Sequence, residues 1–160
     1  YLSLCDFASG DLEHIRQKAT YNAFELGNLL WAEKNADLGK LPIYLYRFNP
    51  EMPGDSSGSF HSSELWFVFE TLAKCWRPFR GKHYDLARQI CNYWTNFAKT
   101  GNPNGPDDDG SPMPYWEPYT ESSPRAMYFG DASAMDEEGY SDLMHFLLKE
   151  GLKKLDCRKE

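Results

Sequence analysis

Residues 42–50 read Pro-Ile-Tyr-Leu-Tyr-Arg-Phe-Asn-Pro, a run of large apolar and aromatic side chains between two prolines. Within this run, residues 43–48 predict a short strand, because such side chains favour extended backbone and the flanking Pro and Asn-Pro are turn signals. The nearly continuous apolar character is typical of a strand covered on both faces, as in a parallel sheet flanked by helices. The stretch therefore predicts a sheet with helices packed around it.

A long polar loop follows the predicted strand over residues 51–59, rich in Pro, Gly, Ser and Asp. Loops at the carboxyl ends of strands are where α/β folds place their chemistry. This loop leads directly into Gly58-Ser59-Phe60-His61-Ser62-Ser63-Glu64-Leu65. We therefore treat the segment around His61 as the first candidate for a functional site.

The apolar spacing further along the chain predicts helices over residues 11–36, 63–74, 83–99 and 135–156, and a second strand over residues 125–129. Residues 100–115 are too rich in Gly, Pro and Asn for a regular element. Strands that alternate with helices indicate the α/β class. Because two strands do not make a stable sheet, the chain is either dominated by helices or its sheet continues outside these 160 residues.

Composition narrows the classes of function. Hydrophobic residues make up 41% and aromatic residues 16% of the chain, which predicts a folded core. The formal charge of -7 disfavours nucleic acids and anionic lipid surfaces as partners, and no stretch approaches the roughly 18 apolar residues of a membrane span. The four cysteines are widely spaced, which favours free thiols and a cytoplasmic location, although a leader segment would lie upstream.

A histidine at the end of a flexible loop can be aimed into a site, and its near-neutral pKa suits general acid and base work. Spacing alone favours a surface or helix-capping histidine, beside a helix that Ser62 or Ser63 caps. The remaining histidines, in polar or helical surroundings, predict structural roles, and no residues show the spacing of a metal site. We interpret the sequence as lacking the G-x-S-x-G motif of a nucleophile elbow, so we expect the nucleophile of any serine hydrolase mechanism to lie outside these residues.

The segment Phe60-His61-Ser62-Ser63-Glu64-Leu65-Trp66-Phe67-Val68-Phe69 resembles the region of the catalytic histidine in type-B carboxylesterases, the family that includes the cholinesterases. Three further segments resemble that family in the same order. They are the helix and strand at residues 29–32 and 42–48, the Trp-x-Asn-Phe-Ala-x-x-Gly-x-Pro-Asn signature at residues 94–104, and the Trp-Pro-x-Tyr-like motif at residues 115–119. The resemblance runs from about residue 20 to the end of the chain.

The resemblance implies that residues 1–160 are the C-terminal portion of an α/β-hydrolase catalytic domain, helix-rich with two or so short core strands. It implies a serine esterase that acts on a small-molecule ester through an acyl-enzyme, without metal or cofactor, in which His61 is the catalytic histidine. Glu64 is assigned a supporting position beside this histidine rather than a place in the triad. The triad acid is expected upstream, and the early carboxylates Asp6, Asp11 and Glu13 are not assigned to it.

Two other interpretations stay open from the sequence. The first is a relative of the esterases that binds or adheres without catalysis, which the presence of His61 argues against. The second is a small helical interaction domain with a closed core and no sheet edge. If the esterase interpretation holds, the strand at residues 43–48 has an uncovered edge in this chain, and we expect self-association through that edge.

Overall fold

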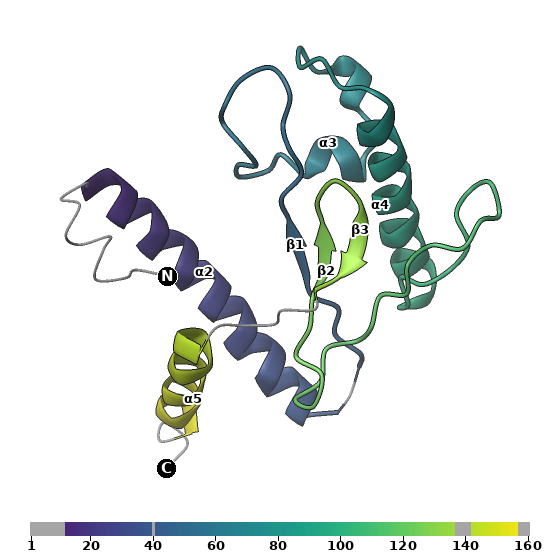
Figure 1. Cartoon of the computed structure of the whole chain (residues 1–160). Helices are drawn as coiled ribbons and strands as arrows, with labels where there is room; N and C mark the ends of the chain where they lie inside the picture. The colour runs from purple at the N-terminus through teal and green to yellow at the C-terminus, as the bar shows by residue number, and fades with distance from the viewer. Residues whose placement is uncertain (1–11, 40, 137–141, 157–160) are drawn as a thin grey trace. The chain divides into compact units, whose positions relative to one another are not determined.

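The computed structural model describes residues 12–39, 41–136 and 142–156 (Figure 1). It divides the chain into two compact units, one comprising Tyr1–Leu41 with Tyr140–Glu160 and the other Pro42–Gly139. In chain order the elements are α2 (Leu12–Asp37), β1 (Tyr46–Phe48), α3 (Leu65–Val68), the 3₁₀ helix η1 (Leu72–Lys74), α4 (Gly81–Thr100), β2 (Met127–Phe129), β3 (Ser133–Met135) and α5 (Asp142–Asp156).

A small sheet with the order β1-β2-β3 forms the centre of the second unit (Figure 1). Strand β1 pairs parallel to β2, and β2 pairs antiparallel to β3. Both predicted strands are confirmed but shorter than expected. Residues 43–45 still bond to the chain beside them, since the carbonyl of Ile43 accepts from the Tyr119 amide at 2.7 Å and that of Leu45 from the Met127 amide at 2.9 Å.

Strand β3 was not predicted, because Ser133-Ala134-Met135 shows neither alternation nor β-branched residues. Its pairing with β2 also corrects the last predicted helix. That helix was expected to start at Met135, but this residue lies opposite Met127 in the sheet, and α5 begins at Asp142.

Helix α4 confirms the helix predicted over residues 83–99. Leu86, Ile90 and Tyr93 form its buried face, as their spacing predicts. At its start the Arg80 amide donates to Nδ1 of His83 at 3.0 Å. At its end Gly101 adopts a left-handed φ of 74° and its amide bonds to the Phe97 carbonyl.

A cluster of buried side chains joins α4 to α3 and to the sheet. Its large members come from all of these elements, so this core fixes the helices against the strands. The buried residues are Met52, Phe67, Val68, Leu72, Phe79, Leu86, Ala87, Ile90, Tyr93, Trp116, Met127 and Phe129.

The predicted helix over residues 63–74 is wrong as one continuous element. Glu70 adopts a left-handed φ of 49°, and this ends α3. The amide of Thr71 bonds to the Trp66 carbonyl and that of Glu70 to the Phe67 carbonyl, which is the bonding of a Schellman helix end. The chain then forms the separate η1 turn. The sequence predicted a single helix because the apolar spacing continues across the break and no glycine marks it.

In the first unit α2 packs against α5, and α2 confirms the helix predicted over residues 11–36. Lys34 Nζ lies 2.8 Å from Asp156 Oδ1. Gly151 permits a close approach of the two helices, because a Cβ at this position would come within 2.8 Å of the Leu30 side chain.

One of the alternatives left by the sequence can be compared with this fold. The parallel β1–β2 pair contradicts a small helical domain without a sheet edge.

Cys75 and Cys91 are free thiols, as predicted, whereas Cys5 and Cys157 lie outside the described residues. Of the helices in the described ranges, none combines the length and apolar character that a bilayer crossing requires.

Candidate active site

His61 lies where the loop that leaves the carboxyl end of β1 meets the start of α3. It occupies the first position of a turn over residues 61–64, and it is exposed. The predicted placement, beyond the strand and at the beginning of the next helix, is therefore confirmed. Its catalytic role stays a prediction.

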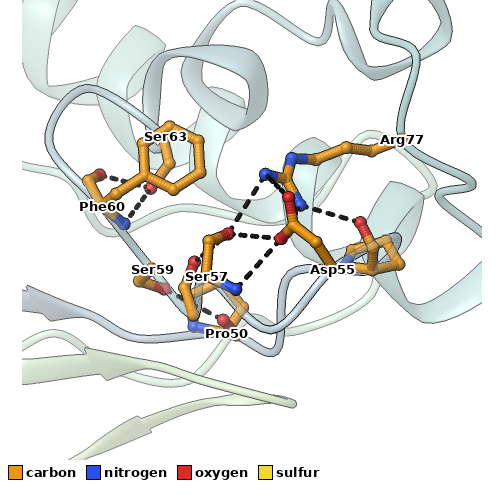
Figure 2. A network of polar contacts seen from close by, with 9 residues as sticks. Pro50, Asp55, Ser57, Ser59, Phe60, Ser63 and Arg77 are labelled. Carbon is orange, nitrogen blue, oxygen red and sulfur yellow. Dashed lines mark hydrogen bonds and ion pairs between the residues drawn. The ribbon is translucent and has the colours of Figure 1, made fainter.

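The backbone on both sides of His61 is held by local hydrogen bonds (Figure 2). The fully buried Ser63 hydroxyl donates to the Phe60 carbonyl at 2.7 Å and accepts from the Phe60 amide at 3.2 Å. Between them Ser62 adopts a left-handed φ of 68°, a conformation that serine adopts only at a local energetic cost. Such residues cluster at functional sites, where the surrounding structure imposes the conformation.

Glu64, not Ser62 or Ser63, is the residue that precedes the first turn of α3. Its side chain makes no capping bond, while its carbonyl accepts from the Phe67 and Val68 amides at 2.9 Å each. The serine caps that the sequence allowed are therefore wrong. Burial and, to a smaller extent, the negative charge of Glu64 raise the pKa of the Tyr46 phenol on β1.

The loop before His61 is tied to the chain after α3 by Arg77, as Figure 2 shows. This buried guanidinium donates to both carboxylate oxygens of Asp55, at 2.8 and 3.0 Å. The hydrogen bonds from Arg77 and from Ser57 hold the pKa of Asp55 well below its usual range. At the other end of the loop the Ser59 hydroxyl donates to the Pro50 carbonyl at 2.9 Å. These contacts oppose the mobility that the polar composition of the loop suggests.

The letters of the nucleophile motif G-x-S-x-G occur once, at Gly54-Asp55-Ser56-Ser57-Gly58. The expectation that the sequence lacks this motif is therefore wrong, and only the structural context distinguishes the segment from an elbow. An elbow places its serine at a sharp turn from a strand into a helix. Here β1 ends at Phe48, α3 begins at Leu65, and the serine lies within an exposed loop.

An open depression of about 500 Å³ lies beside this loop, at the carboxyl end of β1. The turn between β2 and β3 forms its other side. Lys82, from the first turn of α4, reaches Asp131 in this turn at 2.8 Å. The lining residues are Asn49, Pro50, Glu51, Gly58, Tyr128 and Asp131.

The structure does not bring a triad acid to His61 among the described residues. Asp6 and Asp11 lie outside them, and the side chain of Glu13 is not described. Sequence reasoning missed the pairing of Asp55 with Arg77, which lie 22 positions apart, because no motif spans both segments. The described residues also contain no group of His, Cys, Asp and Glu side chains that could hold a metal ion.

Comparisons with known proteins show which family the chain resembles. The model of the carboxylesterase family matches residues 8–147. Carboxylesterase 4A of Bos taurus is 32% identical over 119 residues, which cover 68% of this chain and 20% of the relative. Acetylcholinesterase of Gallus gallus is 35% identical over 97 residues, covering 59% of this chain and 12% of the relative.

Solved structures give the same result for the fold. A carboxylesterase of Geobacillus stearothermophilus superposes with a TM-score of 0.56 and 29% identity, over 72% of this chain and 24% of that one. The chain spans about a fifth or less of the curated relatives named above. The expected fold class, a helix-rich part of an α/β-hydrolase fold, is confirmed. Because the family model matches most of the length of this chain, the chain belongs to the carboxylesterase family.

Proposed function

We propose that this chain supplies the catalytic histidine, His61, of a serine ester hydrolase that acts on carboxylic esters. The observation that carries the proposal is the position of His61, exposed between the carboxyl end of β1 and α3, within the segment that the family model matches. A general base must come within about 3 Å of the oxygen that it deprotonates. An exposed imidazole on a held loop at this edge of the sheet suits that requirement.

The chemistry follows from the acid and base properties of imidazole. His61 takes the proton of a serine hydroxyl while the serine oxygen attacks the ester carbonyl. It then gives this proton to the departing alcohol, and the acyl group stays on the serine as an acyl-enzyme. In the second half His61 takes a proton from water, whose oxygen attacks the acyl group, and returns it to the serine. A carboxylate holds the imidazole in the required tautomer. The mechanism needs no metal or organic cofactor.

We assign the nucleophilic serine and the triad carboxylate to sequence outside these 160 residues. The chain by itself then lacks the nucleophile and the oxyanion hole, which supply most of the chemistry. We expect no hydrolysis of p-nitrophenyl butyrate by the 160-residue chain. A burst of p-nitrophenol together with a covalent serine adduct in this chain would contradict that assignment.

The relatives' names refer to different esters, since one is a carboxylesterase, one an acetylcholinesterase and one a bile salt-activated lipase of Homo sapiens. The proposal therefore stays at the class of carboxylic esters and names no acyl or alcohol group.

The test uses the longer protein that carries this chain together with its nucleophile. A fluorophosphonate probe reacts with a serine that a histidine has activated, so we expect fast labelling of the wild type and labelling slowed by at least about 100-fold in His61→Ala. His145→Ala, an exposed histidine of α5, is the matched control and should label like the wild type. Equal labelling rates for His61→Ala and the wild type would refute the proposal.

A further inference from the structure

We infer that Arg77 is a positioning residue for His61, which it holds in place by clamping the preceding loop through Asp55 and Phe60. The inference rests on the proposed function, because it assigns Arg77 a purpose only if His61 does the chemistry. Arg77 lies 16 positions after His61 in the sequence and outside α3. It reaches back to the loop before the histidine, as Figure 2 shows.

The four terminal N–H groups of Arg77 all have acceptors in one short segment of the loop. Nη1 donates to the Pro53 carbonyl at 3.0 Å and to Asp55 Oδ1 at 2.8 Å. Nη2 donates to Asp55 Oδ2 at 3.0 Å and to the Ser57 hydroxyl at 3.1 Å. The Arg77 side chain is only 5% exposed, whereas that of Asp55 is 44% exposed, so the pair is buried on the arginine side and open to solvent on the carboxylate side.

The same guanidinium contacts the end of the loop. Its central carbon lies 5.2 Å from the centroid of the Phe60 ring and 4.8 Å from that of Trp76. Phe60 is the residue immediately before His61, and Ser63 binds both its amide and its carbonyl. Arg77 therefore fixes the loop at its middle through Asp55 and at its last residue through Phe60.

The arrangement requires an arginine and not merely a positive charge. A planar fork binds both oxygens of a carboxylate and stacks on an aromatic face, whereas an ammonium group does neither in the same way. Packing adds a second constraint. Gly54 has a left-handed φ of 106°, and a Cβ there would lie 3.0 Å from the Trp76 ring, so the loop backbone rests directly on the residue before Arg77.

The first test uses the 160-residue chain and does not depend on catalysis. Arg77→Lys keeps the charge but loses the fork. We expect amide hydrogen exchange over residues 51–62 to accelerate by about 10-fold or more, with α4 unchanged. Arg88→Lys is the matched control, since Arg88 also pairs with an aspartate, Asp107, at 2.7 Å but lies on α4. Unchanged exchange of the loop in Arg77→Lys would overturn the inference.

The second test uses the longer enzyme. A misplacement of about 1 Å costs on the order of 100-fold in rate, so Arg77→Lys should lower kcat by about 10- to 100-fold with KM nearly unchanged, and should shift the pKa seen in the pH profile of kcat. Arg88→Lys should keep both kcat and the pH profile. A loss of activity in Arg77→Lys through KM alone, or with an unshifted pH profile, would mean a merely structural role and overturn the inference.

The two proposals fail in different ways. If His61→Ala keeps its activity, the assignment of the catalytic histidine is wrong, whatever Arg77 does to the loop. If His61→Ala is inactive while Arg77→Lys keeps its kcat, the proposed function stands and the positioning role of Arg77 is wrong.

Discussion

Trp116 packs against five other aromatic rings of the second unit, and its replacement by phenylalanine gives a quantitative test of the fold. The residue is 4% exposed, and its indole Nε1 donates to the Leu45 carbonyl at 3.0 Å. It thereby joins the turn-rich loop to the chain that leads into β1. Its ring lies 5.4 to 6.3 Å from the ring centroids of Tyr44, Tyr46, Tyr93, Trp94 and Phe129.

The expected loss of stability has two parts. Trp116→Phe removes one hydrogen bond, worth about 1 kcal/mol. The Leu45 carbonyl is not left without a donor, because it also accepts from the Met127 amide at 2.9 Å. The substitution removes roughly three buried heavy atoms, which at about 0.8 kcal/mol for each group costs about 2 kcal/mol more. Together they predict a loss of about 3 kcal/mol.

The assay is urea unfolding of the 160-residue chain, read out by hydrogen exchange in α4, which belongs to the same unit as Trp116. With a slope of about 2 kcal/mol per molar urea, the midpoint should fall by about 1.5 M. Tyr115→Phe is the matched control in the same unit, since Tyr115 is 64% exposed, and should change stability by no more than about 0.5 kcal/mol. A loss below about 1 kcal/mol for Trp116→Phe, or equal losses in both variants, would refute this reasoning.

Tyr93→Phe should cost about 1 to 2 kcal/mol in the same unfolding assay, because the buried hydroxyl donates to the Pro114 carbonyl at 2.6 Å and that carbonyl would lose its donor. Glu64→Gln should lower the raised pKa of Tyr46 toward 10.0 in an ultraviolet titration. A folded-state pKa above the unfolded value adds to the free energy of unfolding below about pH 10, and this contribution is lost as pH rises through the folded pKa. Because Glu64→Gln lowers the folded pKa of Tyr46, the variant should lose this contribution at a lower pH than the wild type. The uncovered edge of β1 should cause self-association, and a clean monomer by sedimentation at about 50 μM would count against it.

The sequence predicted elements where local signals and packing agree. Helix α4 has a regular apolar face and a glycine at its end, and both act in the structure as expected. The break at Glu70 carried no such signal, because the left-handed residue that ends α3 is a glutamate and not a glycine. The short β3 forms only because β2 lies beside it, which no pattern within its own residues indicates.

The candidate site divides in the same way. His61 was found through a motif and lies where that motif predicts, at the start of the turn before α3. The clamp of Asp55 and Arg77 could not be found, because an ion pair between two distant loops depends on how the chain folds and leaves no spacing to recognise.

The central claim is that His61 is the general base, and the most direct measurement is kcat for p-nitrophenyl butyrate in the longer protein with His61 intact or replaced by alanine. The account predicts a fall in kcat of several orders of magnitude, on the scale of other triad deletions, with the fold unchanged by circular dichroism. If His61→Ala keeps more than about a tenth of the wild-type kcat, a change of less than about 1.4 kcal/mol in the barrier, His61 is not the catalytic histidine.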